Sequence, residues 1–457
     1  MRLIVAVCLG VSVFAGSARA QDLTRRADSV MRAAEKQGFS GVVRLSKNGS
    51  VVLEKGYGLA NRAGNSAFTP NTVVQIGSNT KDFTAVAILQ LTERGLLSLD
   101  DTLPKFFRSV PPDKRGITVR QLLNHRAGYP LGLGGDFEQS SRDQLIDAAM
   151  KFKLLFEPGS RNSYSNTGYA LLAAIIEIVS GKTYDEYVRD NILRPLGLTH
   201  TGFLLPQFSR DDLAHGYERT GADAGTMLDK PHAADGPYWN LRGNGGMLST
   251  VDDMHAFYDA LFTTEKLLKA ETRKVKFDPS QPVGLAGSDL VNFFLYERDP
   301  RANAEMIIAS TNQNMKAPQV RAPLAALLGF PAMEGMRGGA EGGLARASGK
   351  PVPDDQAKVI RDFIDAINRG DKDYLTSFIR AHVSQGDGDP SPEARSERLG
   401  GIHANLGTLE VLRMTQVDDA IQVLIKTANE GEAILSVVME KTAPFMIMRI
   451  GIQVGGG

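Results

Sequence analysis

The stretch "QIGSNTKDF" occupies residues 75–83. An extended run ends at Gly77, and the residues after it favour a helix, with Ser78 at the expected cap and Lys81 in the first turn. The first turn is the positive end of the helix dipole, where carboxylates are favoured and cations are disfavoured. A capping serine is usually followed three residues later by Glu or Gln. A lysine at this position therefore needs an explanation.

Catalysis supplies one. Residues three apart on a helix share a face, so the amine of Lys81 can reach the hydroxyl of Ser78. The dipole and burial lower the pKa of a lysine, and a base at neutral pH needs a fall of roughly 3 units, which costs about 4 kcal/mol. We interpret Lys81 as the base that activates Ser78 as a nucleophile. The alternative is a capping serine followed by an exposed lysine.

A second motif, Tyr164-Ser165-Asn166, lies just before residues 167–180. The apolar character of those residues predicts a buried helix. Beside Lys81, the hydroxyl of Tyr164 would move a proton between Ser78 and a leaving group. Asn166 would donate to a substrate carbonyl and hold the lysine amine. The alternatives are a helix cap for Asn166 and a packed loop aromatic for Tyr164.

Strand patterns open and close the larger part of the chain. Residues 41–58 contain two β-branched runs around Asn48-Gly49, which predicts a hairpin, and residues 304–311 read as a further strand. Helical periodicity dominates between them. The pattern predicts an α+β domain whose two ends meet in one antiparallel sheet.

A Gly-rich segment, residues 335–353, is typical of a flexible linker. It separates a predicted main domain at 22–334 from a small α+β domain at 354–457. The small domain has helical patterns followed by alternating strand patterns, an order that resembles the cone-shaped fold of nuclear-transport-factor-like domains. That resemblance concerns the fold alone.

The first twenty residues predict a secretory signal peptide. Arg2 precedes an apolar stretch at 3–15, and Ala20 ends an A-x-A cleavage site. The stretch is too short to span a bilayer. Cleavage at residue 20 would remove Cys8, the only cysteine, and with it any disulfide or thiol nucleophile. We expect a periplasmic or secreted protein with no integral membrane segment after cleavage.

Charge and motif content exclude several function classes. Lys plus Arg and Asp plus Glu both number 52, so there is no basic field for a nucleic acid. The seven histidines show no metal-ligand spacing, and we predict neither a metal nor a cofactor. A Ser-His-Asp triad that uses His125 stays open, because triads are defined by geometry, although a structural histidine is favoured.

Residues 39–334 resemble the β-lactamase-related serine hydrolases, which include class C β-lactamases, D-alanyl-D-alanine carboxypeptidases and related esterases. The resemblance implies a β-lactamase/transpeptidase-like α+β fold, with an antiparallel sheet flanked by helices and a helical subdomain. It also implies that Ser78 is the acyl-forming nucleophile, that Lys81 is its partner, and that Tyr164 and Asn166 form the Y-x-N element. The resemblance is carried by "TPNTVVQIGSNTKDFTAVAILQLTERGLLSLDD" (69–101), "ITVRQLLNHRAGYP" (117–130), "EPGSRNSYSNTGYALLAAIIEIVSGKTYDEYV" (157–188), "PLGLTHTGF" (195–203) and "GNGGMLSTVDDMHAFYDAL" (243–261).

The chain departs from the family at one motif. The family has Lys-Thr-Gly or His-Thr/Ser-Gly on the strand beside the site, whereas here Leu285, Ala286 and Gly287 occupy those positions. The N–H of Ser288 would still pair with that of Ser78 as an oxyanion hole. A cation and a hydroxyl that would bind a substrate carboxylate are missing.

The sequence therefore predicts an exported serine hydrolase that forms an acyl-enzyme on ester or amide substrates. Its substrate would be a small molecule or a peptide, and we expect esterase-like activity rather than efficient β-lactam hydrolysis. The alternative is a binding or scaffold protein that keeps the fold but has lost turnover.

Overall fold

The computed structural model describes residues 21–218, 221–288, 291–311, 317–330, 351–385, 391–417, 420–429, 431–440 and 442–454. The predicted signal peptide and residues 335–350 of the predicted linker lie outside the described residues. The chain divides into two compact units, Met1–Pro331 and Ala332–Gly457. Within the described ranges, we find no helix whose length and apolar character would let it cross a membrane.

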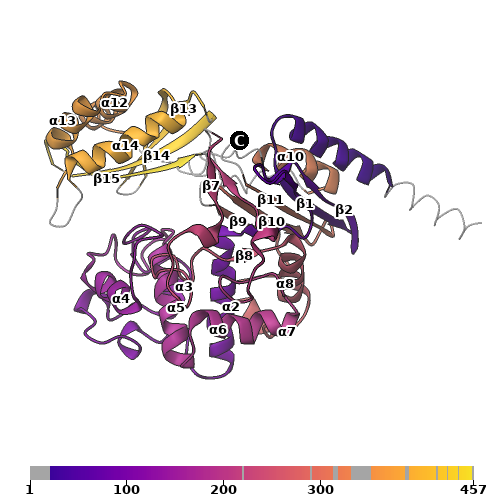
Figure 1. The fold of residues 1–457 in the computed structure, drawn as a ribbon. Coiled ribbons are helices and arrows are strands. Elements are labelled where there is room, and N and C mark those ends of the chain that lie inside the picture. The colour runs from indigo at the N-terminus through magenta and orange to yellow at the C-terminus, as the bar shows by residue number, and fades with distance from the viewer. Residues whose placement is uncertain are drawn as a thin grey trace, which may run out of the picture. The chain divides into compact units, whose positions relative to one another are not determined.

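A five-stranded antiparallel sheet organises the first unit (Figure 1). Its first two strands form the predicted hairpin, and one of them pairs directly with the last strand of the unit, so the expected meeting of the two ends is confirmed. The order is β2-β1-β11-β10-β9, with β1 at Gly41–Lys47, β2 at Ser50–Tyr57, β9 at Val283–Ser288, β10 at Phe293–Asp299 and β11 at Ala304–Ser310.

The sheet is apolar on both faces because successive side chains alternate between them. Val42 and Ile307 join the core on one face, whereas Val43 and Ile308 join the core on the other. Helices α2 (Thr80–Glu93) and α8 (Val251–Thr263) cover the first face, and α10 (Ala317–Leu328) and the helix at residues 21–36 cover the second (Figure 1). The predicted α+β fold class is confirmed.

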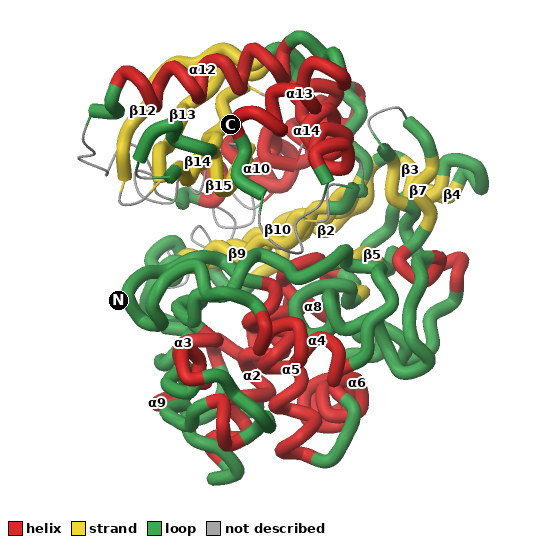
Figure 2. Tube along the Cα trace, turned by 90° about the vertical axis from the view of Figure 1, so that its left-hand side faces the viewer, coloured by secondary structure: helices red, strands yellow, loops and turns green. Residues whose placement is uncertain are grey.

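The helical part of the first unit is built around two buried helices (Figure 2). Helix α2 (Thr80–Glu93) is buried from Thr80 to Leu91, and α5 (Asn166–Ser180) is the predicted apolar helix, ended by Gly181 in the left-handed conformation. Around them lie α3 (Val119–Leu123), α4 (Arg142–Lys151), α6 (Tyr184–Val188), α7 (Arg194–Leu196), α8 (Val251–Thr263), α9 (Ala270–Arg273) and the short strands β3 (Leu59–Asn61), β4 (Ser66–Ala67), β5 (Val74–Gln75), β6 (Gly216–Tyr217), β7 (Asp223–Gly225) and β8 (Leu248–Ser249).

One expectation and one alternative about helix starts are wrong. Ser78 lies in a 3₁₀ turn, η1 (Gly77–Asn79), and makes no side-chain cap for α2, which starts after Asn79. At α5 the cap is Ser165, whose hydroxyl accepts a hydrogen bond from the Gly168 N–H at 3.0 Å, so Asn166 does not cap the helix. The first discrepancy leaves the hydroxyl of Ser78 available to other side chains.

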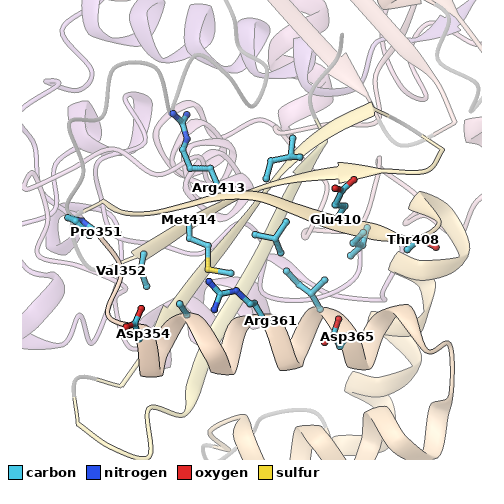
Figure 3. A pocket seen from close by; sticks show the side chains of 14 residues that line it. Pro351, Val352, Asp354, Arg361, Asp365, Thr408, Glu410, Arg413 and Met414 are labelled. Atoms are coloured by element: carbon cyan, nitrogen blue, oxygen red, sulfur yellow. The ribbon is translucent and has the colours of Figure 1, made fainter.

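The second unit has helices followed by a sheet, as predicted. A four-stranded antiparallel sheet in the order β12-β13-β14-β15 packs against three helices around one apolar core. The elements are α12 (Asp354–Asn368), α13 (Lys372–His382), α14 (Pro392–Leu406), β12 (Leu409–Val417), β13 (Ala420–Thr427), β14 (Gly431–Met439) and β15 (Ile447–Val454). A hollow of about 940 Å³ lies between α12 and β12, where Arg361 and Met414 approach each other (Figure 3).

Candidate active site

Two polar side chains, those of Tyr164 and Lys81, meet at the hydroxyl of Ser78. Tyr164 Oη donates a hydrogen bond to Ser78 Oγ at 2.7 Å, and Lys81 Nζ lies 3.1 Å from the same oxygen. Ser78 is half-buried in the 3₁₀ turn, with Lys81 one turn further along the chain. The structure therefore brings together the three residues that the sequence predicted as nucleophile, base and proton carrier.

Lys81 is buried, with 5% of its surface exposed. Its Nζ donates to the carbonyl oxygen of Asn244 at 2.7 Å and lies over the ring of Tyr164, 4.7 Å from the centroid. Burial lowers the pKa of Lys81 to about 7, against the opposing negative charges of Asp82 and Asp136. Near neutral pH the amine can therefore be neutral and present its lone pair to Ser78.

Tyr164 provides a proton donor rather than a base. Burial of its hydroxyl raises the pKa of Tyr164 to about 12, so the phenol stays protonated at neutral pH. Its ring lies against that of His125, with 4.6 Å between centroids.

His125 supports this arrangement without joining a triad. Its Nδ1 accepts a hydrogen bond from the N–H of Ser165 at 3.2 Å, and burial lowers the pKa of His125 to about 3. The imidazole is thus neutral, and it lies between the rings of Tyr164 and Tyr169. This contact favours the structural interpretation of His125.

Asn166 lines the cavity at Ser78, but it does not hold the lysine amine. The carbonyl of Asn244 does so instead, which corrects that part of the sequence interpretation. Asn166 Oδ1 is buried without a hydrogen-bond partner among the described residues, and its backbone N–H donates to the Leu131 carbonyl at 2.7 Å. This side-chain oxygen is therefore left without a partner among the described residues at the wall of the cavity.

The edge strand β9 packs against the turn that holds Ser78 through two glycines. A Cβ on Gly287 would lie 2.5 Å from the nitrogen of Ser78 and 2.1 Å from the carbonyl oxygen of Ile76. Gly77 has φ of +52°, and a Cβ there would lie 2.7 Å from the nitrogen of Ser288. Only residues without a side chain permit this approach, and it brings the backbone around Ser78 and Ser288 together.

The departure from the family motif has a structural meaning on this strand. Leu285 is partly buried and packs against the main core, and Ala286 is exposed on the opposite face of β9. Asn79 Nδ2 donates to the carbonyl oxygen of Leu285 at 3.3 Å. Neither position offers a cation or a hydroxyl to a substrate.

The cavity beside Ser78 measures about 170 Å³. Its walls come from η1, the loop after α3, the start of α5, the glycine cluster before β8 and the end of β9. The larger hollow in the second unit (Figure 3) is lined by residues between Pro351 and Met414, and none of the predicted site residues lies there. The described residues also contain no group of three side chains suited to a metal ion.

Comparison with known proteins places this geometry in a family. The beta-lactamase family model matches residues 26–350, so the chain belongs to the beta-lactamase family, whose fold defines a group of serine hydrolases that includes peptidases, amidases and esterases.

Individual relatives are distant. Penicillin-binding protein 4* of Bacillus subtilis (strain 168) is 28% identical over 273 residues, which cover 57% of this chain and 59% of the relative. The chain thus matches little more than half the length of that curated relative.

Two solved structures share the fold. The octameric penicillin-binding protein homologue of Pyrococcus abyssi aligns with 95% of this chain and 98% of its own at 22% identity and a TM-score of 0.57. EstCE1, described as a hydrolase with promiscuous acyltransferase activity, aligns with 68% of this chain and 99% of its own at 22% identity and a TM-score of 0.56.

Proposed function

We propose that this protein is an exported serine hydrolase that works through an acyl-enzyme on Ser78. The observation that carries the proposal is the convergence of Lys81 and Tyr164 on Ser78 Oγ, at 3.1 and 2.7 Å. A buried amine with a pKa near neutrality beside a hydroxyl is the pairing that nucleophilic catalysis needs.

In the first half-reaction, the Ser78 oxygen attacks the substrate carbonyl and its proton passes to the amine of Lys81. The backbone N–H groups of Ser78 and Ser288 would stabilise the oxyanion, a role that their close approach supports. Tyr164 then gives its proton to the leaving group as the carbonyl–leaving-group bond breaks, and the lysine reprotonates the phenol.

In the second half-reaction, water attacks the acyl-enzyme. Its proton is accepted through the same Lys81–Tyr164 pair, the ester bond to Ser78 breaks, and the serine recovers its proton as the acid leaves. Asn166, on the cavity wall, is our candidate for orienting the acyl group.

The preferred substrates in this proposal are neutral esters or amides. Leu285 packs against the core and Ala286 bears only a methyl group, so the two positions of β9 where the family has a cation and a hydroxyl offer no side chain that would pair with a substrate carboxylate. The nearby cavity of about 170 Å³ suits a short acyl group. We therefore expect short neutral esters to react faster than carboxylate-bearing β-lactams or D-Ala-D-Ala peptides.

One panel of substrates tests this. Wild-type protein and Ser78→Ala are compared on p-nitrophenyl acetate, a cephalosporin and a D-Ala-D-Ala peptide, and both are treated with a fluorophosphonate. Labelling and ester hydrolysis that disappear in Ser78→Ala support the proposal. A wild-type protein that neither labels nor hydrolyses any of the three would instead favour a scaffold that has lost turnover.

Export rests on the leader-like residues 1–20, which lie outside the described residues. Expression of the full chain in a bacterium and N-terminal sequencing of the extracytoplasmic fraction test it. A mature N-terminus at Gln21 is expected.

A further inference from the structure

A buried carboxylate that the proposed reaction does not use lies next to the base. Asp82 follows Lys81 in α2 and has 8% of its surface exposed. Its Oδ2 accepts a hydrogen bond from the hydroxyl of Tyr258 at 2.7 Å. The first turn of α2 favours a negative charge, but burying a carboxylate costs free energy, and within the described residues Tyr258 is the side chain that donates to it.

The hydrogen bonds around Tyr258 have a defined direction. The phenol has one proton, which goes to Asp82, and its oxygen accepts from Asn79 Nδ2 at 2.7 Å. The second hydrogen of the same amide nitrogen reaches the carbonyl oxygen of Leu285 at 3.3 Å. A continuous chain therefore runs from the helix that carries Lys81, through α8, to the turn that carries Ser78 and on to β9.

The chain is rigidly enclosed. Tyr258 is fully buried, and its ring stacks on that of Tyr296 with 3.8 Å between centroids. Helices α2 and α8 lie side by side beneath the sheet (Figure 1), where Phe83 and Phe257 stack at 3.9 Å. Such packing fixes the carboxylate at one place relative to the lysine.

We infer that Asp82 is a positioning residue for the proposed acylation, an inference that rests on the proposed function. Its carboxylate, held by Tyr258, places a fixed negative charge beside Lys81. Through Tyr258 and Asn79 it also ties the start of α2 to the substrate-binding edge of β9.

The direction of the charge effect follows from the surroundings. The anion of Asp82 raises the pKa of Lys81 and opposes the larger effect of burial, whereas burial raises the pKa of Asp82 itself to about 6. Asp82 is therefore ionised at pH 7. Two further groups act on Asp82: Tyr258 of α8 and Lys276, which follows α9. Four further groups lie around Lys81: Asp136, His125, Tyr164 and Tyr169.

Asp82→Asn tests the inference because it removes the charge while leaving an oxygen that can accept from Tyr258. We expect the acid limb of the profile of kcat/KM for p-nitrophenyl acetate against pH to move to lower pH. Relative to its own plateau, the variant should be about two- to threefold more active than wild type at pH 6.5, where most of the wild-type Asp82 carboxyl is still ionised, and this corresponds to a shift of half to one pH unit.

Tyr258→Phe is the second variant. Loss of the hydroxyl removes a hydrogen bond that lowers the pKa of Asp82, so the carboxyl carries less charge near neutrality. The acid limb should move in the same direction by a smaller amount. The matched control is Asp185→Asn in α6: this carboxyl is also buried with a pKa raised to about 6, but its charge does not act on Lys81, and the limb should stay in place.

Circular dichroism melts establish that each variant is folded at the assay temperature. If the acid limb of the kcat/KM profile coincides with that of wild type in both Asp82→Asn and Tyr258→Phe, or moves to higher pH, the inference is overturned. The proposed function would then still stand. A wild-type protein without hydrolysis or fluorophosphonate labelling would defeat the proposed function itself.

Discussion

Tyr164 and Ser78 are 86 positions apart in the sequence, yet the phenol donates to the serine hydroxyl at 2.7 Å. Two different parts of the chain hold the pair: the turn before α2 carries the serine, and the loop before α5 carries the tyrosine. The ring of Tyr164 is fixed from behind by His125 at 4.6 Å. The two hydroxyl groups are thus held together from both sides by separate parts of the chain.

Tyr164→Phe keeps the ring and its contact with His125 but removes the proton. We expect kcat for ester hydrolysis to fall by about 10²- to 10⁴-fold, as is typical when a general acid–base group is lost. The melting temperature should change little, because 45% of the tyrosine surface is exposed. Steady-state kinetics and a thermal melt measure both effects, and unchanged kcat would contradict the assigned role.

The wild-type profile against pH should have one acid limb with a midpoint near 7. The pKa of Lys81 is lowered to about 7 by burial, and only the deprotonated amine accepts the proton of Ser78, so kcat/KM should rise with pH to that point and then level off. The pKa of His125 is lowered to about 3, outside this range. Loss of both the acid limb and the activity in a folded His125→Asn variant would argue for a histidine base instead.

Lys81→Met should abolish turnover yet stabilise the fold near neutral pH. The pKa of Lys81 falls from 10.5 in the unfolded chain to about 7 in the folded protein, so the unfolded state binds more protons between these values and stability rises with pH across that window. At pH 7 the buried amine therefore costs stability on the order of a few kcal/mol. Urea unfolding at pH 7 and pH 10 should show that the variant has the larger free energy of unfolding, by a margin that shrinks at the higher pH. A margin that is equal at both pH values would refute this account.

Gly287→Ala should disable the site without touching a proton-transfer group. The added methyl would meet backbone atoms of Ile76 and Ser78 at 2.1 and 2.5 Å, so β9 must move away from the nucleophile. A displacement of this size can cost about 10²-fold in rate. Ala286→Ser on the exposed face of the same strand is the control, and its kcat/KM should stay within a few-fold of wild type; equal rates in Gly287→Ala would show that the close approach is unimportant.

Local patterns were sufficient to predict much of this architecture. The Asn48-Gly49 turn and the apolar run at 167–180 specify a hairpin and a buried helix by themselves, and both are confirmed. The spacing of Ser78 and Lys81 predicted their proximity because helical geometry fixes it, and the structure places them 3.1 Å apart.

Features that depend on long-range contacts were not visible in the sequence. The carbonyl of Asn244 holds the amine of Lys81, and a backbone oxygen carries no residue-type signal. The chain from Asp82 to Tyr258 links residues 176 positions apart. The cap of α5 is Ser165 rather than the alternative Asn166, because both are good cap formers and only the backbone conformation distinguishes them.

The closest approach between β9 and η1 is made by main-chain atoms that meet at Gly77 and Gly287, and Asn79 of η1 adds a side-chain hydrogen bond to the carbonyl oxygen of Leu285. Substitutions of the side chains at Leu285 and Ala286 can therefore alter the surface of β9 while the glycine contact that holds the strand against η1 stays in place. Homologous chains can thus vary along this edge of the sheet one residue at a time, provided that Gly77 and Gly287 are retained.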